Sequence, residues 1–152
     1  MLNHVSKLIA GLWRGRRRVP MIHQLTMVEC GAACLAMILS YYGRKTTVAA
    51  CREQCSPGRD GLTAKGITRA ARDFGLKARA FSIEPAALDH ITLPVIAHWQ
   101  GNHFVVIERR TEKAFHIVDP SSGRRKINRA EVEGSFSDVV LAFEPGLDFK
   151  PG

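Results

Sequence analysis

In the first half of the chain, apolar residues recur at the three- and four-residue spacing that is typical of helices packed on a core. Two of these stretches stop at a glycine, Gly43 and Gly75, as helices commonly do. Threonines that can cap a helix precede the later two stretches, at Thr46 or Thr47 and at Thr63. The pattern predicts an extended or loop-like segment at residues 21–28, helices at residues 29–42, 47–55 and 63–74, and a loop at residues 56–61.

After Gly75 the hydrophobic period changes from helical to alternating, which is typical of strands. The predicted strands lie at residues 76–83, 94–99, 103–109, 114–118, 126–127 and 139–143. Helices followed by a meandering antiparallel sheet indicate the α+β class, because a parallel sheet would need strands and helices to alternate. We expect one domain at residues 20–146, after a basic N-terminal arm at residues 1–19 and before a short C-terminal tail at residues 147–152.

Composition narrows the class of protein. The chain has 152 residues, of which 45% are hydrophobic, too many for a disordered chain. The longest mostly apolar run, residues 31–42, is far shorter than the roughly 20 residues that cross a membrane as a helix. No glycine-rich phosphate loop ending in Gly-Lys-Ser/Thr is present, so we expect no ATP hydrolysis by this chain alone.

The formal net charge of +8 is concentrated near the N-terminus. Residues 1–28 contain no acid, and their basic residues are Lys7, Arg14, Arg16, Arg17 and Arg18. A solvated tail explains this arm most simply, although its apolar residues at helical spacing would also suit a helix on an anionic membrane. Charge confined to an arm does not indicate a nucleic-acid-binding face. The arm lacks the order of a secretory signal, so we infer a cytoplasmic chain.

Four cysteines form two pairs with helical spacing, Cys30 with Cys34 and Cys51 with Cys55. Four thiolates could hold zinc, but Cys34 lies among alanines, leucine and methionine, as a core cysteine does. No glycine-bearing knuckle accompanies the second pair, and disulfides are unusual in a reducing compartment. We therefore expect no metal site and no cofactor.

Cys30 differs from the other thiols because it lies in the first turn of the first predicted helix. Backbone N–H groups and the helix dipole at that end favour a thiolate. The small residues that follow it leave room for another chain to approach. Glu29 opposes the effect, since a neighbouring carboxylate raises the pKa of a thiol. An effective nucleophile therefore needs a cationic imidazole nearby.

His103 is the best of six candidate histidines, the others being His4, His23, His90, His98 and His116. A hairpin centred on Thr111 would pair Val105 with Ile117 and place His103 opposite Asp119. The polar pair would then close an otherwise apolar face, where the carboxylate could hold the imidazole in one tautomer. An accidental His–Asp pair at a strand end is the competing interpretation.

Gln24 is the fourth candidate, six residues before Cys30. A side-chain amide on the loop that enters the helix can point toward the thiol. Together with a backbone N–H, it would form an oxyanion hole. A glutamine in a loop is more often merely solvated.

In the chain order Gln24, Cys30, His103, Asp119, these residues resemble a papain-like thiol protease site. More narrowly, the sequence resembles the double-glycine leader peptidases of bacterial peptide exporters, over roughly residues 20–146, and most closely the branch that serves ribosomally made, modified peptides. The segments that carry the resemblance are residues 24–37 (QLTMVECGAACLAM), 41–43 (YYG), 59–61 (RDG), 101–106 (GNHFVV) and 118–120 (VDP), with Gly123.

The resemblance implies a papain-like fold of N-terminal helices packed on an antiparallel sheet. Cys30 would be the nucleophile, His103 the general base and acid, Asp119 its orienting residue and Gln24 the oxyanion donor. The substrate would be a precursor peptide cut after a Gly-Gly or similar small pair, in a narrow slot that Trp99 could wall. The family's domain usually precedes membrane-spanning and ATPase domains, which places it in the cytoplasm at the inner face of the bacterial membrane.

One departure and three alternatives accompany this interpretation. Glu29 stands where the family more often has aspartate, which we expect to be harmless. Some members lack the cysteine and only tether cargo, but here the four site residues are present. The chain could be an excised domain or a free-standing relative. The alternatives are a leader-recognition module without significant proteolysis, a transglutaminase-like thiol acyltransferase, and a zinc-binding domain.

Overall fold

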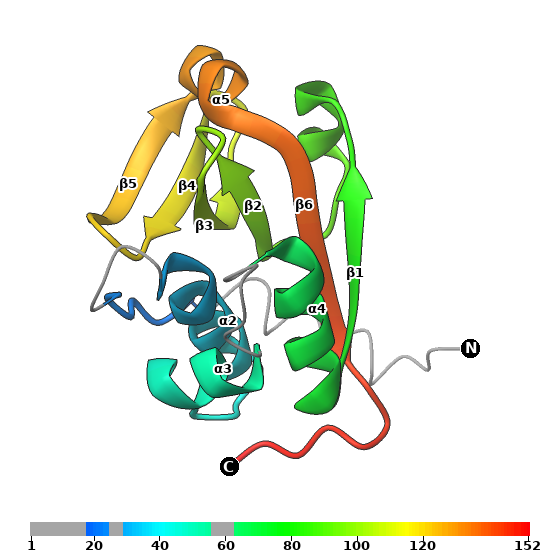
Figure 1. The fold of residues 1–152 in the computed structure, drawn as a ribbon. Helices are drawn as coiled ribbons and strands as arrows, with labels where there is room; N and C mark the ends of the chain where they lie inside the picture. The colour runs from blue at the N-terminus through cyan, green and yellow to red at the C-terminus, as the bar shows by residue number, and fades with distance from the viewer. Residues whose placement is uncertain (1–17, 25–28, 56–62) are drawn as a thin grey trace.

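The structure is a computed structural model that describes residues 18–24, 29–55 and 63–152. The predicted loop at residues 56–61 and most of the predicted arm lie outside the described residues. The elements, in chain order, are α2 (Cys30–Tyr41), α3 (Val48–Gln54), α4 (Ala64–Asp73), β1 (Leu76–Ser82), the 3-10 helix η2 (Pro85–Asp89), β2 (Val95–Trp99), β3 (His103–Arg110), β4 (Ala114–Asp119), β5 (Gly123–Asn128), α5 (Arg129–Ser135) and β6 (Phe136–Pro145). Helices thus precede the sheet, as the α+β class requires (Figure 1).

The three predicted helices are confirmed, and local chemistry fixes their ends. Thr47 Oγ1 accepts a hydrogen bond from the Ala50 N–H at 3.0 Å and so caps α3. Thr63 Oγ1 accepts from the Gly66 N–H at 3.0 Å and caps α4. Glycines with φ of +98° and +100° follow α2 and α4, in a backbone region that other residues rarely adopt. None of the helices in the described part of the chain has the length and hydrophobicity needed to cross a lipid bilayer.

The sheet has six strands in the order β1-β6-β2-β3-β4-β5, and all neighbours are antiparallel. Strands β2 to β5 form the predicted meander. The last strand departs from it, because β6 returns to lie between β1 and β2. Four strands are longer than predicted: β3 and β4 each by one residue, and β5 and β6 by more, with six and ten residues. The helices η2 and α5 were not predicted.

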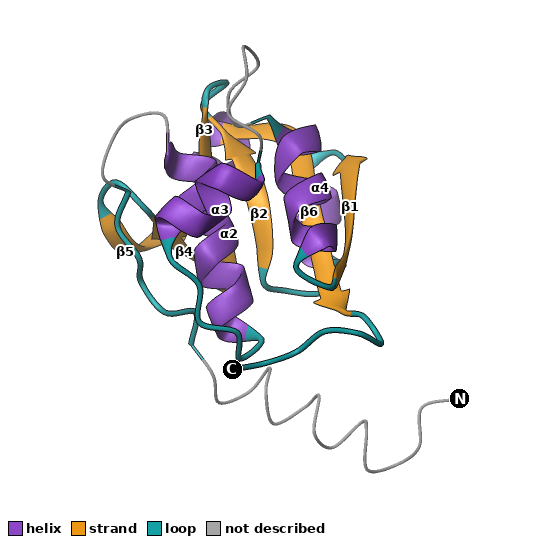
Figure 2. Ribbon diagram, turned by 60° about the horizontal axis from the view of Figure 1, so that its bottom comes forward, coloured by secondary structure: helices purple, strands orange, loops and turns teal. Residues whose placement is uncertain are grey.

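Two core clusters occupy the two faces of the sheet. The first joins α2, α3 and α4 to the strand residues that face them, such as Val106 and Val118. The second lies on the opposite face and includes Val105 and Ile117, with Leu88 of η2. Eleven of the twelve residues of α2 are buried, and this helix contacts β3, α3 and α4 (Figure 2). The N-terminus of α2 is therefore held rigidly against the sheet.

The segments at both ends of the described chain pack on this body. Val19 is 1% exposed, and its N–H donates to Glu108 Oε2 at 2.9 Å. At the other end, the Gly152 N–H donates to the carbonyl of Gly43 at 2.9 Å. Residues on either side of the predicted domain limits thus contact the helical layer and the sheet.

Candidate active site

Cys30 is the first residue of α2 and is 6% exposed. The first N–H groups of a helix have no partner within the helix, so they concentrate positive potential at this thiol. Gly31, Ala32 and Ala33 follow it and are buried, which lets the start of α2 pack closely on the protein. Small residues are therefore what places Cys30 in this position.

The structure brings His103 and Asp119 together, as predicted. His103 begins β3, Asp119 ends β4, and His103 Nε2 lies 2.8 Å from Asp119 Oδ1. Because an ionised carboxylate only accepts, Nε2 is the protonated nitrogen of this bond. The His103 ring also has a side-chain hydrogen bond with Cys30. Since Nε2 faces the carboxylate, Nδ1 is the ring nitrogen left for the thiol.

The electrostatics of the pair suit an imidazolium. Hydrogen bonds with Asp119 and Cys30 raise the pKa of His103 from 6.5 to about 9, although burial works in the opposite direction. Burial works to raise the pKa of Asp119, but hydrogen bonds from His103 and Ser121 outweigh it and hold that pKa well below 3.8. At neutral pH the carboxylate is therefore ionised and the imidazole is protonated.

Ser121 is a part of this site that the sequence analysis missed. Its N–H and its hydroxyl both donate to Asp119 Oδ1, at 2.8 Å and 2.7 Å. Asp119 is 5% exposed, so these bonds fix the orientation of a buried carboxylate. The sequence Asp-Pro-Ser-Ser could have indicated such a turn, because aspartate commonly bonds the backbone two residues ahead.

The predicted register of the hairpin is wrong, by two residues at its open end and by three beside the turn. Ile117 pairs with Ile107, whereas the prediction paired it with Val105. The turn also lies later than predicted, since the Thr111 N–H donates to the Ala114 carbonyl at 2.8 Å. An irregularity in β3 just after Ile107 reduces the offset from three residues beside the turn to two at the open end. The even offset at the open end keeps the side chains there on their predicted face, so the histidine and the carboxylate still meet.

Gln24 lies beside the same corner of the molecule. Its backbone N–H donates to the carbonyl of Pro120 at 3.0 Å, which ties the segment before α2 to the end of β4. Pro120 immediately follows Asp119, so Gln24 enters the site next to the carboxylate. Residues 25–28, which join Gln24 to α2, lie outside the described residues.

The other three cysteines differ from Cys30 in their surroundings. Burial raises the pKa of the Cys34 thiol well above 9.0, and nearby Cys30 and Asp119 raise it further. Burial likewise raises the pKa of Cys51 to about 12 and of Cys55 to about 11. All four are free thiols, and the described residues contain no group of side chains arranged as metal ligands.

Arg52, which contacts the residue directly before Cys30, is a second residue that the sequence analysis missed. Its Nη1 lies 2.6 Å from Glu29 Oε1, and the Glu29 side chain is only 4% exposed.

The prediction that Trp99 forms a wall of a substrate slot is not supported, because Trp99 is 2% exposed and packs in the second core cluster. Gly101, two residues later, is exposed and has open space beside its Cα.

Together these side chains form a thiol, an imidazole and a carboxylate linked in series at a helix start, as in cysteine peptidases. The model of the peptidase C39 family matches residues 18–148, nearly the whole chain. The chain belongs to the peptidase C39 family. Members of this family are cysteine peptidases, and the match makes the chain a cysteine peptidase domain.

Curated relatives of this C39 domain are longer proteins. The probable microcin-H47 secretion/processing ATP-binding protein MchF of Escherichia coli is 37% identical over 136 residues, which cover 90% of this chain and 20% of that protein. The transport/processing ATP-binding protein ComA of Streptococcus pneumoniae is 32% identical over 136 residues, and the match covers 84% of this chain and 19% of that protein. The chain thus spans about a fifth of the length of these relatives.

Solved structures agree with the family and with the papain-like fold. A double glycine motif protease from an AMS/PCAT transporter, crystallised in complex with the leader peptide, superposes with a TM-score of 0.81. It is 42% identical, and the match covers 87% of this chain and 95% of that one. The peptidase domain of Streptococcus ComA gives a TM-score of 0.79 at 23% identity, with 84% and 99% covered.

Proposed function

We propose that this C39 domain is an endopeptidase that removes the leader from ribosomally made precursor peptides by cutting after a Gly-Gly-type junction. The observation that carries the proposal is the hydrogen-bonded series from Cys30 through His103 to Asp119, at the first residue of α2. The 42% identical double glycine motif protease supports the choice of junction.

In the proposed mechanism, the Cys30 thiolate attacks the carbonyl carbon of the second glycine. The His103 imidazolium then gives its proton to the leaving amine, which departs as the new N-terminus of the mature peptide. The leader remains as a thioester on Cys30. His103, now neutral, takes a proton from a water molecule, whose oxygen attacks the thioester and frees the leader carboxylate. Asp119 holds the imidazole in the required tautomer throughout.

Gln24 and the start of α2 would stabilise the oxyanion that forms in both steps. The amide of Gln24 and the Cys30 N–H are the two proposed donors. The backbone bond from Gln24 to Pro120 supports this role, because it places the glutamine at the end of the sheet where Asp119 lies. Such donors act mainly on the transition state, where the negative charge develops.

We further propose that the domain works beside the membrane-spanning and ATP-binding domains of a peptide exporter, in the cytoplasm at the inner face of the bacterial membrane. The names of the longer relatives, which join processing and transport, support this setting. Leader removal would then be coupled to export of the mature peptide.

The test is mass spectrometry of a synthetic precursor that contains a leader, a Gly-Gly junction and several following residues. We expect two products whose masses place the cut after the second glycine. Cys30→Ala should give no product, and Cys34→Ala, the matched control, should still cleave. An intact precursor that still binds would favour the leader-recognition module. Added amine that appears on the leader carboxyl in place of water would favour an acyltransferase. Either result would overturn the proposal.

A further inference from the structure

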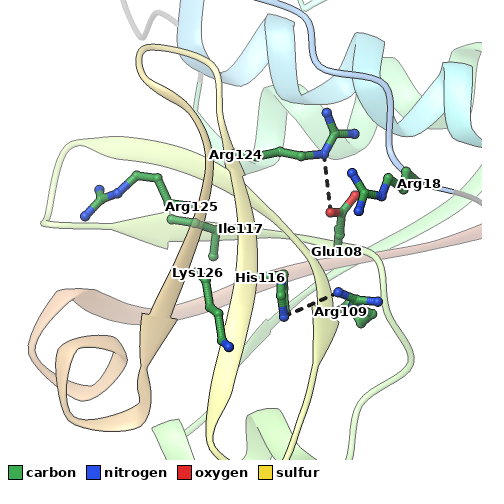
Figure 3. A pocket seen from close by; sticks show the side chains of 8 residues that line it. All are labelled: Arg18, Glu108, Arg109, His116, Ile117, Arg124, Arg125 and Lys126. Atoms are coloured by element: carbon green, nitrogen blue, oxygen red, sulfur yellow. Dashed lines mark hydrogen bonds and ion pairs between the residues drawn. The ribbon is translucent and has the colours of Figure 1, made fainter.

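A basic pocket lies on strands β3, β4 and β5, and none of the proposed catalytic residues lines it. It has a volume of about 220 Å³, and its lining includes Arg18, Arg109, His116, Arg124 and Lys126 (Figure 3). Arg109 lies six residues along β3 from His103, roughly 20 Å at the rise of a strand. At the other side of the pocket, Arg124 pairs with Val118, the residue before Asp119. The pocket therefore begins beside the proposed catalytic residues and extends away from them, and it shares no residue with them.

Three of these side chains form a row across the sheet, which we call the basic row: Arg109, His116 and Lys126. The register pairs His116 directly with Arg109 on one side and with Lys126 on the other. Arg109 Nη2 lies 3.4 Å from His116 Nε2. Directly opposed side chains in a sheet have Cβ atoms about 5 Å apart. The lowered pKa of His116 leaves its ring neutral at pH 7, so the ring can accept from Arg109, and the charges of the row are those of Arg109 and Lys126 on either side of it.

The positive charge of the row is not neutralised by its surroundings. Glu108 is the one acid of the pocket, and it is engaged by Arg124 at 3.5 Å and by the Val19 N–H at 2.9 Å. Among the described residues, neither Arg109 nor Lys126 forms an ion pair with an acid. Burial lowers the pKa of His116 below 6.5, and Arg109, Lys126 and Arg18 lower it further, whereas Glu108 raises it.

We propose that the basic pocket binds a phosphate group. Its size is below the roughly 300–1,000 Å³ of pockets for drug-sized ligands, so it suits a compact group. Guanidinium groups of Arg18 and Arg109 and the ammonium of Lys126 approach it from different elements (Figure 3). Separate cationic donors suit the several charged oxygens of a phosphate better than the single charge of one carboxylate. The bound anion would relieve the repulsion within the row.

The phosphate could belong to a free compound or to the headgroup of an anionic lipid. Both present the same oxygens to the pocket, and the experiment separates them. The proposal does not depend on the proposed peptide cleavage, because none of the pocket residues belongs to the series from Cys30 to Asp119. Failure of one proposal therefore leaves the other standing.

The first measurement is calorimetric titration with inorganic pyrophosphate at low ionic strength. The test variant is Arg109→Gln/Lys126→Gln, which leaves the structural contacts of Arg124 intact. The matched control is Lys77→Gln/Arg79→Gln, which removes two cations from β1 at the opposite edge of the sheet. We expect the test variant to bind about tenfold to a hundredfold more weakly, as for loss of charged hydrogen bonds, and the control to bind as the parent does.

The second measurement is co-sedimentation with vesicles of phosphatidylcholine, with and without phosphatidylglycerol. Binding that needs phosphatidylglycerol and is lost only in the test variant would assign the pocket to a lipid headgroup. Loss of pyrophosphate binding alone would assign it to a free phosphate compound. No binding in either assay, or equal loss in the test and control variants, would overturn the proposal. The proposal would also be overturned if the pocket bound an acidic peptide without phosphate and bound neither of the two probes.

A third readout uses the row itself. Arg109→Gln/Lys126→Gln removes two of the cations that help to lower the pKa of His116, so this pKa should rise toward 6.5 in the absence of anion. Pyrophosphate should raise the midpoint of the parent and raise the pKa of His116 measured by NMR, but should leave the midpoint of the variant unchanged. A midpoint of the variant that responds to pyrophosphate as the parent does would contradict the proposal, whatever its absolute stability.

Discussion

Arg52 donates to Glu29 across 2.6 Å, and Glu29 is the residue directly before Cys30. The Glu29 side chain is 4% exposed, whereas that of Arg52 is 47% exposed, so a surface arginine of α3 reaches a buried carboxylate. A buried carboxylate without a partner is costly, so the arginine stabilises Glu29 in the interior. Helix α3 thus holds the residue directly before Cys30 as well as packing against α2.

The first prediction concerns this pair. Arg52→Met should lower the free energy of unfolding by about 1–3 kcal/mol, because it leaves the buried Glu29 carboxylate without its partner. Glu29→Gln in the same background should restore most of the stability, since it removes the unpaired charge. Arg69→Met, at an exposed position of α4, is the matched control and should change little in thermal unfolding. An equally unstable double variant would show that Arg52 acts only through packing.

The second prediction concerns selectivity among the thiols. Limited iodoacetamide near pH 7 should label Cys30 alone, because burial raises the pKa of Cys34, Cys51 and Cys55. Among the four thiols, Cys30 is the one that has a hydrogen bond with His103, and it lies at the start of α2. Peptide mapping after partial labelling checks this, with the denatured protein as the reference for equal access. Comparable labelling of Cys34 in the folded protein would contradict it.

The meeting of His103 and Asp119 could be predicted from the sequence, although the register could not. Side chains alternate along a strand, so any even offset preserves the face on which they lie. The turn at Thr111 and the irregularity after Ile107 depend on local hydrogen bonds that the hydrophobic pattern does not contain. The prediction that His103 meets Asp119 therefore succeeded, because it needed only an offset by an even number of residues.

Other features were beyond the sequence because they arise from tertiary contacts. Strand β6 returns between β1 and β2, and no local pattern specifies the neighbours of a final strand. Arg52 lies 23 residues after Glu29, and the pairing depends on how α3 packs against α2. The helix ends, by contrast, were predicted well, since capping threonines and terminal glycines act within a few residues.

The third prediction concerns Ser121. Ser121→Ala removes the 2.7 Å hydroxyl bond to Asp119 but keeps the 2.8 Å bond from the backbone N–H. We expect kcat for leader cleavage to fall severalfold with KM unchanged, because the carboxylate is less firmly oriented and substrate is not contacted. Ser122→Ala, the exposed neighbour, should leave both constants as in the parent. A changed KM in Ser121→Ala would assign the hydroxyl to substrate binding.

The fourth prediction concerns Gln24. Gln24→Ala should lower kcat by something like 10²–10³, the usual effect of removing one oxyanion donor. KM should barely change, since the bond strengthens only as charge develops on the carbonyl oxygen. Gln24→Glu keeps the size but loses the N–H donors, so it should be similarly slow. A normal kcat with a raised KM in either variant would point to substrate holding.

The fifth prediction concerns the dependence of the cleavage rate on pH. The raised pKa of His103, about 9, means that the imidazolium needed to protonate the leaving amine persists until pH approaches 9. The basic limb of kcat/KM should therefore lie near pH 9 in the parent. Asp119→Asn removes the hydrogen bond that contributes most to the raised pKa, so the pKa of His103 should fall toward 6.5 and the limb should move down by roughly 1–3 pH units.

Stability should follow the same groups. Because the pKa of His103 is raised on folding, its contribution is fully present below pH 6.5 and is lost as the pH rises through about 9. The unfolding midpoint of the parent should then fall between these values more steeply than that of Asp119→Asn. Asp119 stays ionised across this window, since its pKa is held well below 3.8, so the slope reports His103. The two plots of unfolding midpoint against pH could instead run parallel, with the basic limb of kcat/KM unmoved in Asp119→Asn. Another group would then control the protonation of the leaving amine.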